Sequence, residues 1–460
     1  MKENETENML NVLINDNIQR NNLLLSFTNF ILATTNGVIA IDGKWGSGKT
    51  FFVRQLHFLI NYLNNYDENG KIKNEEMYTN NLLNLENVSH DIKNNLIDFM
   101  KTIRNDHRLS NLESVNCIYF NAWEYENNTE PILSLVYKII NDFPYLTAKM
   151  EQAKMDLITG TLDAISNFLF KGNINLSNCT SKKNLLENII TSEEARFKIN
   201  KLFEDLLYEN CNKMVIVIDE LDRCNPAYAI KLLEEIKHYI NSENITIIIS
   251  TNLYQVSNSI KNLYGYNFDV ESYLDKTIDI TFELPPVDKE NYIRNLLPGY
   301  QSDRLFEKVI INYINYYGLE MRSINKYINL MKLYRDHINE TKNFENINYI
   351  LDFLFLPYIL GQRLFRIKDY SEFVSGKGFE EFKGFIMYSK NAHYLIKNCI
   401  HLGESISQDI IEADIKDIYN FLYNYDKNNR EIKVGKIEFD SYQRDKFLML
   451  CTVFKNLSIK

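Results

Sequence analysis

The stretch GVIAIDGKWGSGKT, residues 37–50, changes from a mainly apolar run to a glycine-rich, polar loop after its first six residues. VIAI, residues 38–41, is apolar and mostly β-branched, which is typical of a strand buried on both faces of a sheet. The loop that follows fits the pattern G-x-x-x-x-G-K-[ST], with its glycines, lysine and threonine in the fixed places. Apolar residues at helical spacing then run through residues 50–63. The order of strand, loop and helix predicts a phosphate-binding loop.

This loop is expected to hold the phosphates of a nucleotide. Glycines let backbone N–H groups turn inward, and these donors bind phosphate oxygens together with the positive end of the next helix. Lys49 is expected to reach the β- and γ-phosphates, and Thr50 to offer its hydroxyl to Mg²⁺. The predicted nucleotide contacts are Gly43, Trp45, Gly46, Ser47, Gly48, Lys49, Thr50 and Phe51.

A second apolar run, VIVI at residues 215–218, stops at two acids, Asp219 and Glu220. We expect Asp219 to hold Mg²⁺ and Glu220 to polarise the attacking water. Alternatively, Glu220 and Asp222 cap the helix that follows. For Asp222 both interpretations stay open.

Further apolar runs predict three more strands, at residues 115–120, 245–252 and 277–282. The polar and aromatic block NAWEY follows the first of them, at an edge where open α/β sheets bind ligands. For Trp123 in this block, packing of a helix onto the sheet is favoured over a nucleotide contact. Asn252 ends the second run, where a sensor of the γ-phosphate or of the attacking water is expected.

The predicted fold is an α/β core with a mostly parallel sheet flanked by helices. We expect a helical lead-in at 1–35, a core at 36–286 with helical insertions near 67–110 and 147–200, a helical lid at 287–340 and a helical C-terminal domain at 341–460. In the lid, Arg322 is a candidate to reach the nucleotide phosphates. The alternative is that Arg322 belongs to a solvated basic helix face.

The composition narrows the class of protein. The 460-residue chain has a net charge of −10, which argues against broad nucleic-acid binding but leaves a local basic groove open. The first ten residues lack the cationic start and apolar core of a secretory signal.

The longest apolar run, at 349–361, is too short to cross a bilayer and predicts a buried core helix. Cysteines without C-x-x-C spacing fit reduced thiols, so we expect a cytoplasmic protein without membrane spans.

Four motifs carry a resemblance: GKWGSGKT, FNAWEY at 120–125, VIDELDRCNP at 217–226, and the stretch from YLDKTIDITFELPP at 273–286 to MRSINKYIN at 321–329. Together they resemble the KAP family of P-loop NTPases, over roughly residues 15–335. The chain departs from the family pattern at Glu220, where the family has Asp, and at Asn252, where it often has Asp. The expected insertions lack the membrane-spanning helices of many members, so the chain resembles a soluble prokaryotic type.

The resemblance implies Mg²⁺-dependent binding of ATP or GTP, slow hydrolysis, and use of that cycle as a conformational or assembly switch. Several prokaryotic members belong to antiviral systems, and the implied partners are further copies of the chain or an effector protein. The candidate catalytic residues are Glu220, Lys49, Asn252 and Arg322, with Lys276 as an alternative to Arg322 as the sensor of the γ-phosphate. In a further alternative, Arg223 or Lys276 acts across a subunit contact. Two other functions stay open: a nucleotide-stabilised scaffold that recruits an effector without sustained turnover, and a nucleic-acid-stimulated motor.

Overall fold

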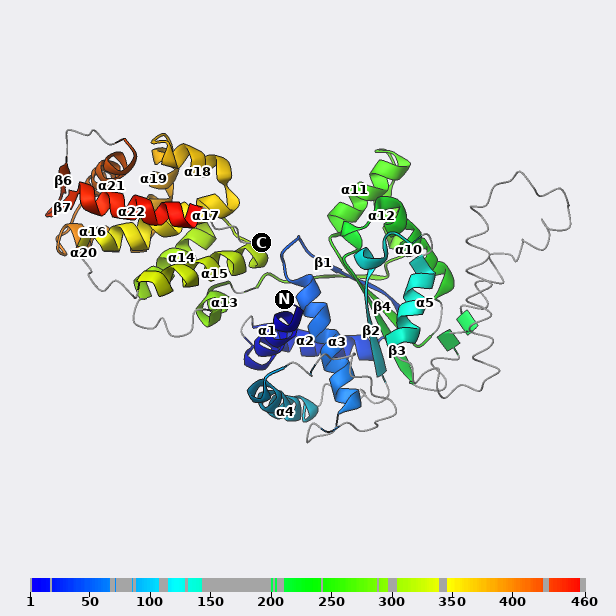
Figure 1. The fold of residues 1–460 in the computed structure, drawn as a ribbon. Coiled ribbons are helices and arrows are strands. Elements are labelled where there is room, and N and C mark those ends of the chain that lie inside the picture. The colour runs from blue at the N-terminus through cyan, green and yellow to red at the C-terminus, as the bar shows by residue number, and fades with distance from the viewer. Residues whose placement is uncertain are drawn as a thin grey trace. The chain divides into compact units, whose positions relative to one another are not determined.

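A parallel sheet of five strands forms the centre of the first of two units, Met1–Val287 and Asp288–Lys460. The strands are β1 (Gly37–Asp42), β2 (Val115–Asn121), β3 (Lys213–Asp219), β4 (Ile245–Thr251) and β5 (Ile280–Glu283). Their order is β2-β3-β4-β1-β5, and all neighbours run parallel (Figure 1). All five strands therefore present their carboxyl ends at one edge. The expected α/β core is confirmed.

The computed structural model describes residues 2–16, 19–66, 71, 85, 88–106, 115–128, 131–142, 200–201, 203–204, 211–240, 243–287, 289–296, 304–338, 346–424 and 430–455. In the first expected insertion, near 67–110, it places the helix α4 (His90–Arg104). The second expected insertion, near 147–200, lies outside the described residues except for its last position.

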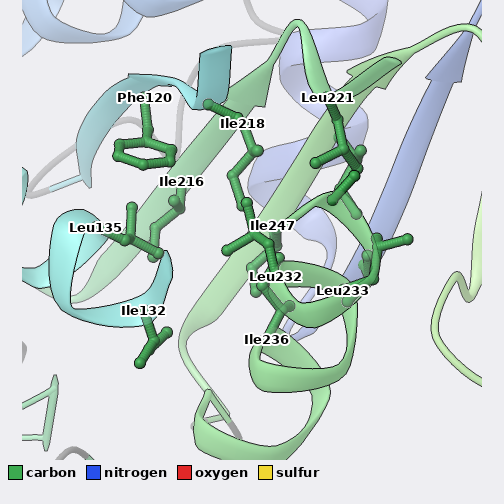
Figure 2. Packing of buried hydrophobic residues seen from close by; sticks show 14 of the residues in the cluster. Phe120, Ile132, Leu135, Ile216, Ile218, Leu221, Leu232, Leu233, Ile236 and Ile247 are labelled. Carbon is green, nitrogen blue, oxygen red and sulfur yellow. The ribbon is translucent and has the colours of Figure 1, made fainter. Parts of the chain in front are cut away.

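Helices cover both faces of the sheet. One layer holds α1 (Lys2–Asn15), α2 (Asn21–Ala33), α3 (Lys49–Asn65) and α4, and the other holds α5 (Pro131–Asp142), α10 (Pro226–Tyr239), α11 (Leu253–Tyr264) and α12 (Val270–Asp275). Ile39 and Ile41 of β1 pack into the first layer, while Val38 and Ala40 pack into the second. Figure 2 shows the second core, where residues of β3, α5 and α10 meet. Burial on both faces explains the continuous apolar runs of the strands.

The last strand is shorter and later than the sequence predicts. It was expected at 277–282, and β5 spans Ile280–Glu283. The N–H groups of Thr277 and Ile278 both donate to the carbonyl of Leu274, at 2.8 Å each, and so complete a turn after α12. The N–H groups of these two residues are therefore used in the turn that ends α12, and the residues do not pair with β1.

The second unit is mainly helical. Its helices are α13 (Lys289–Leu296), α14 (Arg304–Tyr316), α15 (Met321–Ile338), α16 (Asn346–Ile350), the π-helix η4 (Leu351–Phe355), α17 (Leu356–Phe365), α18 (Ile367–Val374), α19 (Phe379–Tyr388), α20 (Lys390–Ile400), α21 (Gln408–Tyr423) and α22 (Ser441–Lys455). The buried core helix expected at 349–361 is confirmed, with a π-helical turn in its middle. The C-terminal helices were expected, and the structure adds a short antiparallel hairpin of β6 (Glu431–Val434) and β7 (Ile437–Asp440).

Among the helices that the structure describes, none combines the length and the apolar composition that a membrane span requires.

Candidate nucleotide-binding site

The loop between β1 and α3 has the geometry of a phosphate cradle. Gly48, at the N-cap of α3, has φ 90° and ψ 19°, a left-handed conformation that favours glycine. A Cβ atom at Gly43 would lie 2.7 Å from Oγ of Ser47, which is too close for a real contact. Because α3 begins at Lys49, its free N–H groups and its positive end lie at this loop. Strand, loop and helix N-terminus together make a site for phosphate oxygens.

The amine of Lys49 lies against this loop. Its side chain is buried, and Nζ donates to the carbonyl of Gly43 and, at 3.1 Å, to that of Lys44. Burial lowers the pKa of Lys49, and three neighbouring carboxylates oppose that shift. They belong to Asp222, Asp219 and Asp42. The amine is therefore a cation among acids, and phosphate oxygens can replace the loop carbonyls that now hold it.

Arg20 reaches the loop from a segment far away in the sequence. It is only 3% exposed, and its Nη1 donates to the carbonyl of Ser47 at 3.2 Å. Its Nη2 donates to the carbonyl of Pro285, which follows β5. Burial lowers the pKa of Arg20 to about 10. The sequence analysis missed this residue, because an arginine ahead of an apolar helix carries no signal of such contacts.

Asp219 ends β3 with a side chain that is 1% exposed. Tyr119, on the neighbouring strand β2, donates its hydroxyl to Oδ2 of Asp219 at 2.8 Å. Burial raises the pKa of Tyr119, so this phenol stays protonated and donates. Sequence reasoning missed Tyr119, since its role depends on the pairing of β2 with β3. The hydrogen bond orients the carboxylate that was predicted to bind metal.

The donor set fits Mg²⁺. This ion prefers hard oxygen ligands and is usually bound by one or two protein groups together with phosphates and water. The carboxylate of Asp219 and the hydroxyl of Thr50, in the first turn of α3, are ligands of that kind.

Buried hydroxyl groups without partners gather at the same edge. Oγ of Ser47, Oγ of Ser250 and Oγ1 of Thr251 have no hydrogen-bond partner among the described residues. Ser250 is the register partner of Asp219, and Thr251 is that of Asp42. Because buried polar groups are nearly always hydrogen-bonded, these hydroxyls are available to a polar ligand or to water at the carboxyl ends of β1 and β4.

Glu220 lies in an ion pair. Its backbone has φ 61° and ψ 28°, which is uncommon for a residue other than glycine. Oε1 of Glu220 is 3.1 Å from Nη1 of Arg223, in the 3₁₀-helix η3 (Leu221–Arg223). The guanidinium of Arg223 in turn lies 5.5 Å from the ring centre of Trp123. The pair and the ring join the ends of β2 and β3.

The prediction that Trp123 packs a helix onto the sheet is wrong, because its side chain is 47% exposed. Trp123 belongs to the 3₁₀-helix η2 (Ala122–Tyr125). Its neighbours Ala122 and Tyr125 take the place in the core instead. Trp123 is left at the surface, beneath Arg223.

A hydrogen bond to Asp222 links the phosphate loop to the segment that follows β3. The indole N–H of Trp45, a loop residue that is 55% exposed, donates to Oδ2 of Asp222. The cap of α10 is Asn225, whose Oδ1 accepts from the N–H of Ala227 at 3.0 Å. The interpretation of Glu220 and Asp222 as caps of this helix is therefore wrong.

Asn252 follows β4 and caps α11, where its Oδ1 accepts from the N–H of Gln255 at 3.4 Å. Asp42, which the sequence analysis missed, supports the same helix end by accepting from the N–H of Leu253 at 2.9 Å. Because β4 lies between β1 and β3, Asn252 stands at the carboxyl edge between the phosphate loop and the acids. A sensor role for Asn252 stays a prediction.

Two further candidates carry exposed charges. Lys276 is exposed at the end of α12, and Arg322 is exposed on α15 of the second unit. Contact between Arg322 and a bound phosphate stays a prediction.

A glycine loop at the first strand, a buried lysine and an acid that ends β3 define a P-loop nucleotide-binding protein. The model of the KAP family P-loop domain matches residues 19–347. The chain therefore belongs to the KAP family of P-loop NTPases, and this membership implies nucleotide binding. A search of curated proteins finds no significant match.

Proposed function

We propose that the chain binds ATP or GTP with Mg²⁺, hydrolyses it slowly, and uses the cycle as a conformational or assembly switch. The observation that carries this proposal is the position of Lys49, a buried cation on the phosphate loop among three carboxylates. The unpartnered hydroxyls at the same edge support a phosphate and its hydration shell.

Each residue has its own task in this reaction. Lys49 and the N–H groups of the loop offset the negative charge of the phosphates. Thr50 and Asp219 would hold Mg²⁺, which when bound neutralises further phosphate charge. Glu220 accepts a proton from the attacking water as the oxygen of that water bonds to the γ-phosphorus. The bond from the γ-phosphorus to the bridging oxygen breaks, and the nucleoside diphosphate leaves.

P-loop proteins without an arginine aimed at the γ-phosphate hydrolyse slowly, and a supplied arginine adds about 10³- to 10⁵-fold. We propose that such an arginine comes from a second copy of the chain, or from Arg322. Assembly then controls the rate, and the nucleotide controls assembly.

We also propose that the cycle serves an antiviral system in which an effector protein does the damage. The likeness to prokaryotic KAP proteins supports this role. A phage-infection assay tests it: Lys49→Ala is expected to remove protection that the wild type gives in the presence of its neighbouring genes. Equal protection by both would contradict the role.

The binding step is tested by calorimetry with ATP and Mg²⁺. We expect Lys49→Ala to abolish measurable binding, because a buried cation at the phosphates is lost. Lys101→Ala is the matched control, since Lys101 is an exposed lysine of α4 that pairs with Asp98 at 3.6 Å. Equal affinity in wild type and Lys49→Ala would contradict the proposal.

Molar mass measured with and without ATP and Mg²⁺ tests assembly, and a constant mass would favour the scaffold function.

A further inference from the structure

The carboxylate expected to activate water is covered by a neighbour. The side chain of Glu220 is 12% exposed and that of Arg223 is 32% exposed, and their charged atoms lie 3.1 Å apart. The ring of Trp123 supports the guanidinium from the side of β2. In these contacts the carboxylate of Glu220 is paired with the guanidinium of Arg223. This ion pair has to break before the whole carboxylate is available to accept a proton from water.

The cation lies near the site expected for a competing partner. Arg223 directly follows Asp222, which accepts a hydrogen bond from Trp45 of the phosphate loop, so Arg223 lies at the edge where phosphates are expected to bind. A guanidinium binds a phosphate through two parallel N–H bonds, and a triphosphate carries far more charge than one carboxylate. A γ-phosphate can therefore displace Glu220 from Arg223, whereas a diphosphate has no group at that position.

We propose that Arg223 is a positioning residue that exchanges Glu220 for the γ-phosphate of a bound triphosphate and thereby releases Glu220 to act on water. This inference rests on the proposed function, because it requires nucleotide at the loop. The exchange lets the site distinguish triphosphate from diphosphate, and it makes the 3₁₀-helix η3 the segment that responds first.

The chain contains a natural reporter of this exchange. It has two tryptophans, Trp45 and Trp123, so Trp45→Phe leaves Trp123 as its only tryptophan. A guanidinium over an indole ring perturbs the emission of that ring. Departure of Arg223 from Trp123 is therefore expected to change the fluorescence of the Trp45→Phe protein.

The experiment measures this fluorescence with Mg²⁺ and either a non-hydrolysable ATP analogue or ADP. We expect the analogue to change the emission of Trp123 and ADP to leave it as it is. In the Trp45→Phe, Arg223→Gln protein the response to the analogue is expected to disappear. Its affinity for the analogue is expected to fall about ten- to a hundredfold, as for a lost hydrogen bond to a charged group. Its affinity for ADP should remain within about twofold.

Arg366→Gln is the matched control. Arg366 also pairs with acids, Asp369 and Glu381, and lies 4.9 Å from the ring centre of Tyr317, but it belongs to the second unit. We expect this change to leave the response of Trp123 intact. If Arg223→Gln does not fold, Arg223→Lys replaces it, since an ammonium keeps the charge without the paired N–H groups. The response is then expected to shrink.

Occupancy is measured separately, by calorimetry on the same proteins and on the wild type, because Trp45 is itself a predicted nucleotide contact. If no nucleotide binds to the wild type, the proposed function fails. If both nucleotides bind and give the same emission, or if the response survives Arg223→Gln, the exchange is overturned and the proposed function stands.

Discussion

Arg20 connects parts of the first unit that are distant in sequence. Its guanidinium holds the carbonyl of Ser47 in the phosphate loop and that of Pro285 after the last strand. Pro285 lies three residues before the second unit begins at Asp288. The contacts of Arg20 therefore link the phosphate loop to the segment that leads into the second unit.

We expect Arg20→Ala to lower the free energy of unfolding by about 1–3 kcal/mol, because the carbonyls of Ser47 and Pro285 lose a charged donor. The loop also loses its support, so ATP affinity should fall. Arg20→Lys is expected to recover part of both, since an ammonium reaches fewer acceptors at once. Denaturant unfolding and calorimetry measure the two effects. An Arg20→Ala protein that loses stability but binds ATP as tightly as the wild type would contradict the support of the loop.

Tyr119 is expected to tune the metal site through Asp219. Tyr119→Phe removes the hydroxyl that orients this carboxylate at 2.8 Å. Loss of such an outer partner typically weakens metal affinity about 10- to 100-fold, so the Mg²⁺ concentration for half-maximal activity should rise. Tyr137→Phe is the control, because Tyr137 is 59% exposed on α5. Equal Mg²⁺ dependence in the two variants would show that Tyr119 only fills space.

The positions of the motif residues could be predicted from the sequence because they depend on local spacing. Lys49 and Thr50 follow the glycine loop directly, and Asp219 directly ends an apolar run. Arg20 and Tyr119 could not be predicted, because their partners come from other strands and loops and depend on strand order.

At the scale of elements, apolar runs located β1 to β4 because strands buried on both faces lack polar positions. The β6–β7 hairpin was missed, although Gly435 divides two short segments, EIKV and KIEFD. Its strands have four residues each, and Gly435 adopts φ 56° in the turn between them. Such a glycine flanked by alternating residues is the signal that predicts a hairpin.

The π-helix η4 carries a partly buried acid, Asp352, which makes stability depend on pH. Burial raises the pKa of Asp352 to about 6, while the hydroxyl of Tyr334, at 2.7 Å, and the charge of Lys446 oppose that shift. The unfolded chain releases this proton near pH 4, so between about pH 4 and 6 the folded state binds more protons. The free energy of unfolding should therefore fall as the pH rises through this window, by at most about 3 kcal/mol.

Asp352→Asn is the test of this dependence, because an amide resembles the protonated acid. We expect the variant to lose less stability than the wild type between about pH 4 and 6. Asp409→Asn, an exposed change on α21, is the control. Denaturant unfolding at several pH values measures the difference, and equal slopes for Asp352→Asn and wild type would count against the raised pKa.

At the scale of the whole molecule, the observed boundary after Val287 falls one residue beyond the predicted end of the core. The helices predicted as a lid, α13 to α15, belong to one unit with the C-terminal helices. The sequence could not predict this grouping, because aromatic stripes mark a buried face without showing which helix covers it. Tyr313 of α14, for example, packs on Tyr358 of α17 and Phe385 of α19.

The most direct test of the central claim is nucleotide turnover by the wild type, Glu220→Gln and Lys49→Ala, with ATP and Mg²⁺ at several protein concentrations. We predict slow hydrolysis by the wild type with a rate per chain that rises with concentration, binding without turnover by Glu220→Gln, and neither by Lys49→Ala. A wild type that binds ATP but does not hydrolyse it at any concentration would contradict the account and leave the nucleotide as a structural ligand.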